Sequence, residues 1–240
     1  MIIEIRLSPN FSPKTRKSKD IKVIVIHYTG MQSKIESVEK LSCPKHKVSC
    51  HYLIDRQGRV LKMVNENKIA WHAGKSKWKN FSDLNSNSIG IELVNKGHEF
   101  GYEKFTNSQI NKLIQLCQIL RIKYKIKNSN IVGHSDIAPL RKKDPGEKFP
   151  WNKLEKKKIG ISFNKSKIKL MEIDKKKLQK LFFQNLFKIG YRYFNLNRRS
   201  KKDIFIIKAF QRRFVQNKVS GLIDKKTYIT SHFLANYYKN

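Results

Sequence analysis

The sequence predicts an α/β domain followed by a small helical domain, and three observations lead to this fold class. Apolar, β-branched runs at 22–28, 88–94 and 131–133 are typical of buried strands. An apolar pattern with helical spacing follows Thr106, and three more such patterns lie beyond residue 173. A length of 240 residues fits one medium and one small domain, and a hydrophobic content of 39% can support packed cores.

The first strand is predicted at 22–28, where the sequence reads KVIVIHY. His27 lies near the C-terminal end of this run, and Thr29-Gly30 interrupt it. Because ligands of open α/β sheets gather at the carboxyl ends of strands, His27 is a candidate for chemistry.

The segment 51–64 predicts a β-hairpin with its turn at Asp55 to Gly58. The strand predicted at 88–94 carries one acidic residue, Glu92, in an otherwise apolar run. Burying an ionised carboxylate is costly unless it is paired or functional. Glu92 is therefore paired with a lysine, exposed on an edge strand, or used as a general base or acid.

The predicted helix that follows starts with a capping box formed by Thr106 and Gln109. Apolar residues then recur at helical spacing as far as Leu120. Residues 131–134 read as a short strand that again ends on a histidine, His134. The next loop is rich in turn-forming residues.

Composition changes at 153–169, where Lys and Ser dominate as in a linker. We therefore expect an α/β domain at 1–158, a linker at 159–172 and a helical domain at 173–240.

Three helices are predicted in the C-terminal domain. Asp174, the pair Ser200 and Asp203, and Asp224 are suitable N-caps, and Gly190 is a suitable stop for the first helix.

Two histidines at strand ends and a carboxylate form a suitable ligand set for one catalytic zinc ion. His27, His134 and Asp144 offer such a set, with the fourth position left for water. From spacing alone, ordinary structural histidines are the more common interpretation. Lys142 is either a solvated loop lysine or, beside a zinc ligand, a group that stabilises an oxyanion.

Five segments of the chain follow one another in a characteristic order. They are IVIHYTG (24–30), SCHYLIDRQGRV (49–60), AWHAG (70–74), NSIGIEL (87–93) and VGHSDIAPLRKKDPGEKFPW (132–151). Together they resemble the type 2 N-acetylmuramoyl-L-alanine amidases, the AmpD and AmiD group, which is related to peptidoglycan recognition proteins. The resemblance covers roughly residues 8–151 and implies a central mixed β-sheet flanked by helices.

The resemblance implies a role for each matching residue. His27, His134 and Asp144 match the zinc ligands, Glu92 the catalytic acid, and Lys142 the lysine of the K-x-D-P-G motif. The positions that match the lining of the substrate groove are His51, Trp71, His72, Ala73 and Asn85. Ser86 stands where the family usually has an acidic residue, which leaves the details of peptide recognition open.

Outside these motifs, His46, His98 and His232 are expected to face solvent.

The C-terminal segment IIKAFQRRFVQNKVSGLIDKKTYI (206–229) resembles a small three-helix peptidoglycan-binding domain. It has Ser220-Gly221 where that module usually has Asp-Gly. The alternative is a helical cap on the first domain, because a fold alone does not establish binding.

A formal net charge of +34 suggests an anionic partner or a general compositional bias. No nucleic-acid partner is expected, because no reader motif accompanies the charge. The N-terminus is a poor signal peptide and no segment is long enough to span a bilayer. These features favour a cytoplasmic location, with the periplasm or cell envelope as the alternative. Separately, we expect the protein to be a monomer.

The resemblance implies a zinc-dependent hydrolase that cuts the amide between the lactyl group of N-acetylmuramic acid, or its 1,6-anhydro form, and L-alanine of peptidoglycan. Its role would be cell-wall turnover or muropeptide recycling in a bacterium. The alternative is a recognition protein that binds muropeptide without cutting it. The presence of all three ligand positions, with Glu92 and Lys142, favours the enzyme.

Overall fold

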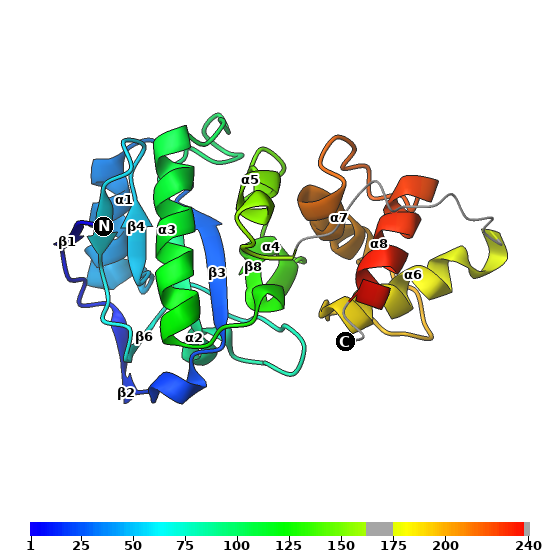
Figure 1. Cartoon of the computed structure of the whole chain (residues 1–240), viewed down its shortest axis with the longest axis horizontal. Coiled ribbons are helices and arrows are strands. Elements are labelled where there is room, and N and C mark those ends of the chain that lie inside the picture. The colour runs from blue at the N-terminus through cyan, green and yellow to red at the C-terminus, as the bar shows by residue number, and fades with distance from the viewer. Residues whose placement is uncertain (162–174, 238–240) are drawn as a thin grey trace.

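The computed structural model describes residues 1–161 and 175–237. It shows an α/β lobe and a smaller helical lobe packed side by side along the long axis (Figure 1). The first lobe contains a six-stranded mixed sheet flanked by helices, and the second contains three helices. The predicted fold class is confirmed.

The strands are β1 (Ile3–Ile5), β2 (Phe11–Thr15), β3 (Val23–Tyr28), β4 (Tyr52–Ile54), β5 (Val60–Lys62), β6 (Lys68–Ala70), β7 (Ser88–Leu93) and β8 (Ile131–Gly133). The helices are α1 (Lys34–Ser42), α2 (Leu84–Asn87), α3 (Asn107–Lys123), α4 (His134–Ile137), α5 (Trp151–Lys156), α6 (Lys175–Ile189), α7 (Asp203–Phe214) and α8 (Lys225–Tyr237).

The main sheet has the order β1-β5-β4-β7-β3-β8, while β2 and β6 form a separate antiparallel pair. Strands β4, β7, β3 and β8 are parallel to one another. The register pairs His27 on β3 with Glu92 on β7. Because paired residues of neighbouring strands point to the same face, both side chains stand together at the carboxyl end of the sheet.

Alternate residues of β3 enter two different cores, as expected for a strand buried on both faces. Ile24 and Ile26 pack with the apolar side of α3. Val23 and Val25 pack on the opposite face, in a cluster that includes Phe182 and Phe210 of the helical lobe. The core on this face of the sheet therefore continues into the helical lobe.

Several local predictions are confirmed. The hairpin pairs β4 with β5 around a turn in which Gly58 has a φ of +84°. Thr106 and Gln109 form their capping box at the start of α3. Asp224 caps α8 through the Thr227 amide.

Part of the predicted domain division falls outside the residues that the structure describes. Asp174 and most of the predicted linker at 159–172 lie outside them. Of the predicted Ser200–Asp203 cap, one hydrogen bond is present, in which the Asp203 carboxylate accepts from the Ser200 amide. Helix α7 begins at Asp203, so Lys202 occupies the N-cap position in place of Ser200.

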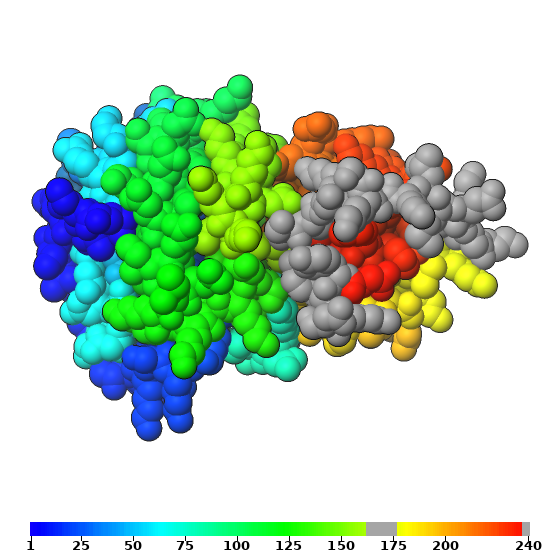
Figure 2. All heavy atoms as spheres, viewed as in Figure 1, coloured from blue at the N-terminus to red at the C-terminus, as the bar shows by residue number. Residues whose placement is uncertain are grey.

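The two lobes share an apolar cluster, and aromatic and charged side chains add further contacts between them. Trp78 of the α/β lobe packs edge-to-face against Tyr191, with ring centroids 5.2 Å apart. Arg213 of α7 lies 4.3 Å from the ring of Trp151 at the start of α5. In space-filling view the α5 and α7 regions meet at the waist of the molecule (Figure 2).

Among the described helices, none combines the length and the apolar character that a membrane-spanning segment requires.

Candidate metal centre and catalytic pocket

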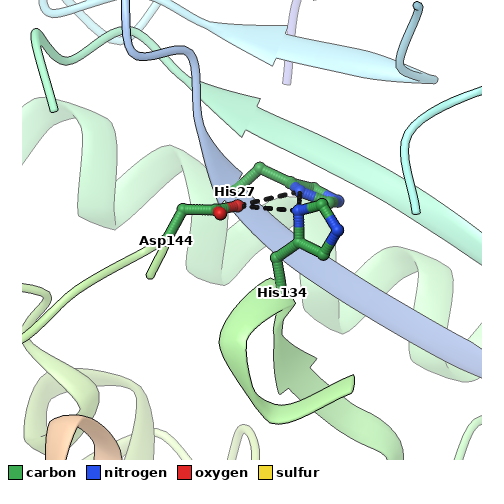
Figure 3. A group of neighbouring side chains, drawn as sticks. All are labelled: His27, His134 and Asp144. Atoms are coloured by element: carbon green, nitrogen blue, oxygen red, sulfur yellow. Dashed lines mark hydrogen bonds and ion pairs between the residues drawn. The ribbon is translucent and has the colours of Figure 1, made fainter. Parts of the chain in front are cut away.

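Three buried side chains converge at the carboxyl end of the sheet (Figure 3). His27 is the penultimate residue of β3, His134 is the first residue of α4, and Asp144 lies in the loop after it. The Nδ1 atoms of the two histidines are 2.9 Å apart. Asp144 Oδ2 lies 3.1 Å from His27 Nδ1 and 3.0 Å from His134 Nδ1.

Hydrogen bonds on the far side of each imidazole fix its tautomer. His134 donates from Nε2 to the carbonyl of Ala73 at 3.1 Å. His27 Nε2 lies 3.0 Å from His72 Nδ1, and His72 Nε2 lies 3.3 Å from the Ser88 hydroxyl, which itself donates to the Leu84 carbonyl. These hydrogen bonds form a consistent donor-to-acceptor series when His27 and His72 each donate from Nε2. Both metal-facing Nδ1 atoms then carry lone pairs.

These three groups fit a metal cation. Burial, assisted by the charge of His134, lowers the pKa of His27 to about 4, which keeps the ring neutral near pH 7. Burial alone would raise the pKa of Asp144, but His134 and His27 outweigh it and hold that pKa far below its usual range. Two lone pairs and a carboxylate facing one another repel unless a cation lies between them. Ligand atoms on a tetrahedral zinc ion are roughly 3.3 Å apart, close to the spacing here.

The loop at 71–73 is held in place by Asn85. Its side-chain oxygen accepts hydrogen bonds from the His72 and Ala73 amides at 3.1 Å and 2.7 Å. The loop thereby supplies partners for both candidate histidine ligands. Such outer contacts orient ligands and tune their basicity.

A glycine explains how His72 can lie over the sheet. A Cβ atom at Gly90 of β7 would lie only 2.3 Å from Cγ of His72. The glycine in the sequence NSIGIEL therefore makes room for the ring that contacts His27.

Glu92 stands beside the three candidate ligands without a partner for one of its oxygens. Its Oε1 lies 4.0 Å from His27 Nδ1, while Oε2 is buried and makes no hydrogen bond to any residue that the structure describes. Burial, together with the charge of Asp144, raises the pKa of Glu92 well above its usual value, although Lys142 opposes the shift. Of the alternatives left open by the sequence, a salt bridge between Glu92 and a lysine is not found among the described residues.

A cavity of about 380 Å³ opens over these groups. Its walls include Glu92, His134, Asp144 and Lys142, together with Trp71 and His72. Lys142 therefore lies in the pocket with the candidate ligands, as its position two residues before Asp144 suggested.

The other three residues predicted to contact substrate lie behind the pocket. His51 has no exposed surface, and its Nδ1 accepts from the Gly90 amide at 3.0 Å. Ala73 is fully buried, and Asn85 acts through the loop described above. As placed, these three support the loop and the sheet under the pocket.

One rim of the pocket was missed by the sequence patterns. The Tyr28 hydroxyl lies 2.8 Å from His98 Nδ1, and His98 Nε2 lies 3.2 Å from Glu147. The expectation that His98 faces solvent is wrong, because these contacts and a stacked Tyr102 ring partly enclose it. Tyr28 directly follows His27, which is the only local signal.

Comparison with known proteins agrees with this site. A family model described as N-acetylmuramoyl-L-alanine amidase matches residues 17–147, more than half of the chain. The N-acetylmuramoyl-L-alanine amidase AmiD of Escherichia coli is 40% identical over 154 residues, which are 58% of this chain and 54% of AmiD. The 1,6-anhydro-N-acetylmuramyl-L-alanine amidase AmpD of Haemophilus influenzae is 35% identical over 164 residues, 61% of this chain and 86% of AmpD.

The chain thus spans about half the length of the curated AmiD and most of AmpD. A solved structure of AmiD from Escherichia coli in complex with anhydro-N-acetylmuramic acid-L-Ala-D-gamma-Glu-L-Lys superposes with a TM-score of 0.81 at 31% identity. The superposition covers 95% of this chain and 92% of the AmiD chain, so the similarity extends over both lobes.

Proposed function

The chain belongs to the N-acetylmuramoyl-L-alanine amidase family, and on that basis we propose that it hydrolyses the amide between the muramic acid lactyl group and L-alanine. The observation that carries the proposal is the buried Glu92 carboxylate, whose Oε2 has no hydrogen-bond partner among the described residues, beside three converging ligand atoms in an open pocket. A buried acid with a raised pKa next to a cation site is suited to moving a proton.

We propose His27, His134 and Asp144 as the ligands of one zinc ion. A zinc ion held there would supply Lewis-acid chemistry, polarising the scissile carbonyl and making water a better nucleophile. The mixed nitrogen and oxygen donor set, with one side open to the pocket, supports zinc.

Glu92 is proposed to take the proton of the attacking water and deliver it to the amine of the leaving L-alanine. Both transfers are favoured when the pKa of the acid lies nearer neutrality than that of a free glutamate, and burial shifts the pKa of Glu92 in that direction. Lys142 is proposed to stabilise the oxyanion of the tetrahedral intermediate from the same pocket.

For the substrate we propose a muropeptide or peptidoglycan strand. The AmiD relative was solved with an anhydro-muramyl tripeptide, which makes the 1,6-anhydro form a good first substrate. Trp71 and His72 are the proposed pocket-wall contacts, and His51, Ala73 and Asn85 are proposed to shape the pocket from behind. A role of the C-terminal domain in wall binding would favour intact sacculi as the second substrate.

The experiment offers purified protein both intact sacculi and anhydro-muropeptides, with and without a chelator, and identifies products by mass. Release of the free stem peptide with an L-alanine amino terminus, abolished by the chelator and restored by Zn²⁺, is the expected result. Binding of either substrate without any release would instead favour a recognition protein and overturn the proposed activity.

A further inference from the structure

Two of the three candidate metal ligands lie on segments that the C-terminal helices contact. We propose that the C-terminal domain positions these ligands: Arg213 and Tyr191 hold the segment of His134, and Gln216 with Arg212 holds the segment that follows Asp144. This inference rests on the metal site proposed above. It assigns the domain a role inside the catalytic lobe, whether or not the domain also binds cell wall.

The first contact is a buried ion pair two residues beyond His134. Asp136 of α4 is 1% exposed, and its Oδ2 lies 2.5 Å from Arg213 Nη1 of α7, whose side chain is 3% exposed. The Tyr191 hydroxyl donates to the other carboxylate oxygen at 2.5 Å. Both donors come from the C-terminal domain, so this lobe fixes where the Asp136 carboxylate lies.

Two of these groups, Asp136 and Arg213, also reach the backbone of β8 just before α4. Asp136 Oδ2 accepts from the amide of Gly133 at 2.8 Å, and Arg213 donates through Nη2 to the carbonyl of Ile131 at 2.7 Å. His134 lies between the residues that are held. A shift of Arg213 would therefore displace the start of α4, where the imidazole is attached.

The second contact holds the loop after Asp144. Gln216 donates through Nε2 to the carbonyls of Glu147 and Phe149 at 2.9 Å and 2.8 Å. Arg212 lies 3.8 Å from the Glu147 carboxylate. Residues 212–216 thus reach both the α4 segment and the loop, and they fix the distance between them.

Cohesion between the lobes does not require this network. The interface already contains a large apolar cluster with Trp78, Phe182 and Phe210. A buried ion pair contributes little net stability compared with apolar residues of similar volume, because both charges must be desolvated. The distinctive property of this ion pair is its fixed geometry, because each N–H or O–H donor must point at a particular oxygen.

The test compares interface variants with a matched control in the full-length chain. Arg213→Met removes the ion pair, Arg213→Lys retains the charge but not the forked geometry, and Tyr191→Phe removes a single hydroxyl. The control is Arg199→Met, which removes an arginine–aspartate pair inside the C-terminal domain, where Arg199 Nη1 lies 3.4 Å from Asp203.

Two readouts are taken for each variant. Zn²⁺ affinity is measured by competition with a chromophoric chelator, and the geometry of the site is followed through the visible absorption bands of bound Co²⁺. Unfolding of the metal-free protein in urea is recorded beside them. A role limited to holding the lobes together would change the unfolding curve alone.

We expect Arg213→Met to weaken Zn²⁺ binding by about tenfold or more and to change the Co²⁺ bands, as loss of outer contacts to metal ligands does. Arg213→Lys should recover part of the affinity, Tyr191→Phe should show a smaller loss, and Arg199→Met should match the wild type. If Arg213→Met does not fold, Tyr191→Phe combined with Gln216→Leu takes its place.

Unchanged affinity and spectra in the folded interface variants would overturn the positioning role while leaving the proposed function intact. An equal loss in Arg199→Met would also overturn it, because the effect would then be unspecific. Failure of the wild type to bind Zn²⁺ at all would instead remove the metal site on which both proposals rest.

Discussion

The two halves of the candidate site are held by different means. His27 and Glu92 stand on adjacent central strands, and the parallel register of β3 and β7 sets their spacing. His134 and Asp144 stand on a short helix and a loop, where side chains from a domain far along the chain reach their segments. A sheet fixes a site through repeated backbone bonds, whereas a loop needs particular side chains to do so.

The strongest test of the sheet-borne half is Glu92→Gln, which retains size and removes the acid. We expect kcat to fall by about 10²–10⁴-fold, the usual contribution of a general acid–base group. Zn²⁺ affinity should stay near that of the wild type, because Glu92 Oε1 lies 4.0 Å from His27 and is not among the three converging ligands. Turnover of an anhydro-muropeptide and chelator competition give the two values; near-normal turnover would remove Glu92 from the mechanism.

A smaller loss is expected when the contact behind His27 is removed by His72→Phe. His27 then loses the acceptor for its Nε2 proton, so its ring orientation is less restricted. Zn²⁺ affinity should fall by about 10–100-fold, as for other outer contacts of metal-bound histidines. Trp71→Phe, in the same loop, is the control for affinity, and an equal loss in both variants would contradict a specific role of the His72 ring.

Next in size is Gly90→Ala, which adds a methyl group under the same ring. The new Cβ would lie 2.3 Å from His72 Cγ, so the free energy of unfolding should drop by about 1–3 kcal/mol. Urea titration of the metal-free protein measures this change. In a His72→Ala background the loss of stability caused by Gly90→Ala should largely disappear. If the losses of the two substitutions were instead additive, the added methyl group would clash with a residue other than His72.

The last prediction concerns pH and the buried His51. Burial, with the nearby charge of Arg16, lowers the pKa of His51 to about 3, against about 6.5 in an unfolded chain. Between these values the unfolded chain binds one more proton at this position, so stability falls as the pH drops below about 6.5. The slope from this residue is up to about 1.4 kcal/mol per pH unit.

His51→Gln should remove that part of the slope. Urea titrations of wild type and variant between about pH 6.5 and 4.5 compare the two slopes directly. Parallel lines would mean that His51 does not remain neutral inside the fold.

Sequence patterns predicted the sheet-borne half well because its signals are local. An apolar strand that ends in His27 and an acid within the apolar run 88–94 are both visible over a few residues. Asp144 and Lys142 were candidates from their loop after His134, and the ordered motifs matched them to family roles by resemblance. Patterns of this kind show where a residue lies along its strand. In a parallel sheet, residues at the carboxyl ends of neighbouring strands lie close together.

The contacts behind the site were not predictable in the same way. Asp136 and Arg213 are 77 residues apart in sequence, and neither belongs to a pattern that indicates a partner. His51 belongs to a family motif, but only the fold shows that its ring has no exposed surface. Burial and long-range pairing depend on how the lobes pack, which a local pattern does not contain.

The shared core of the two lobes also has a consequence for synthesis on the ribosome. Val23, Val25 and Trp78 belong to an apolar cluster that also contains residues translated only after position 180. At roughly 5–20 residues per second, several seconds pass before the residues that complete this core are made. The last three described helices therefore complete the core of the first lobe as well as extend the molecule.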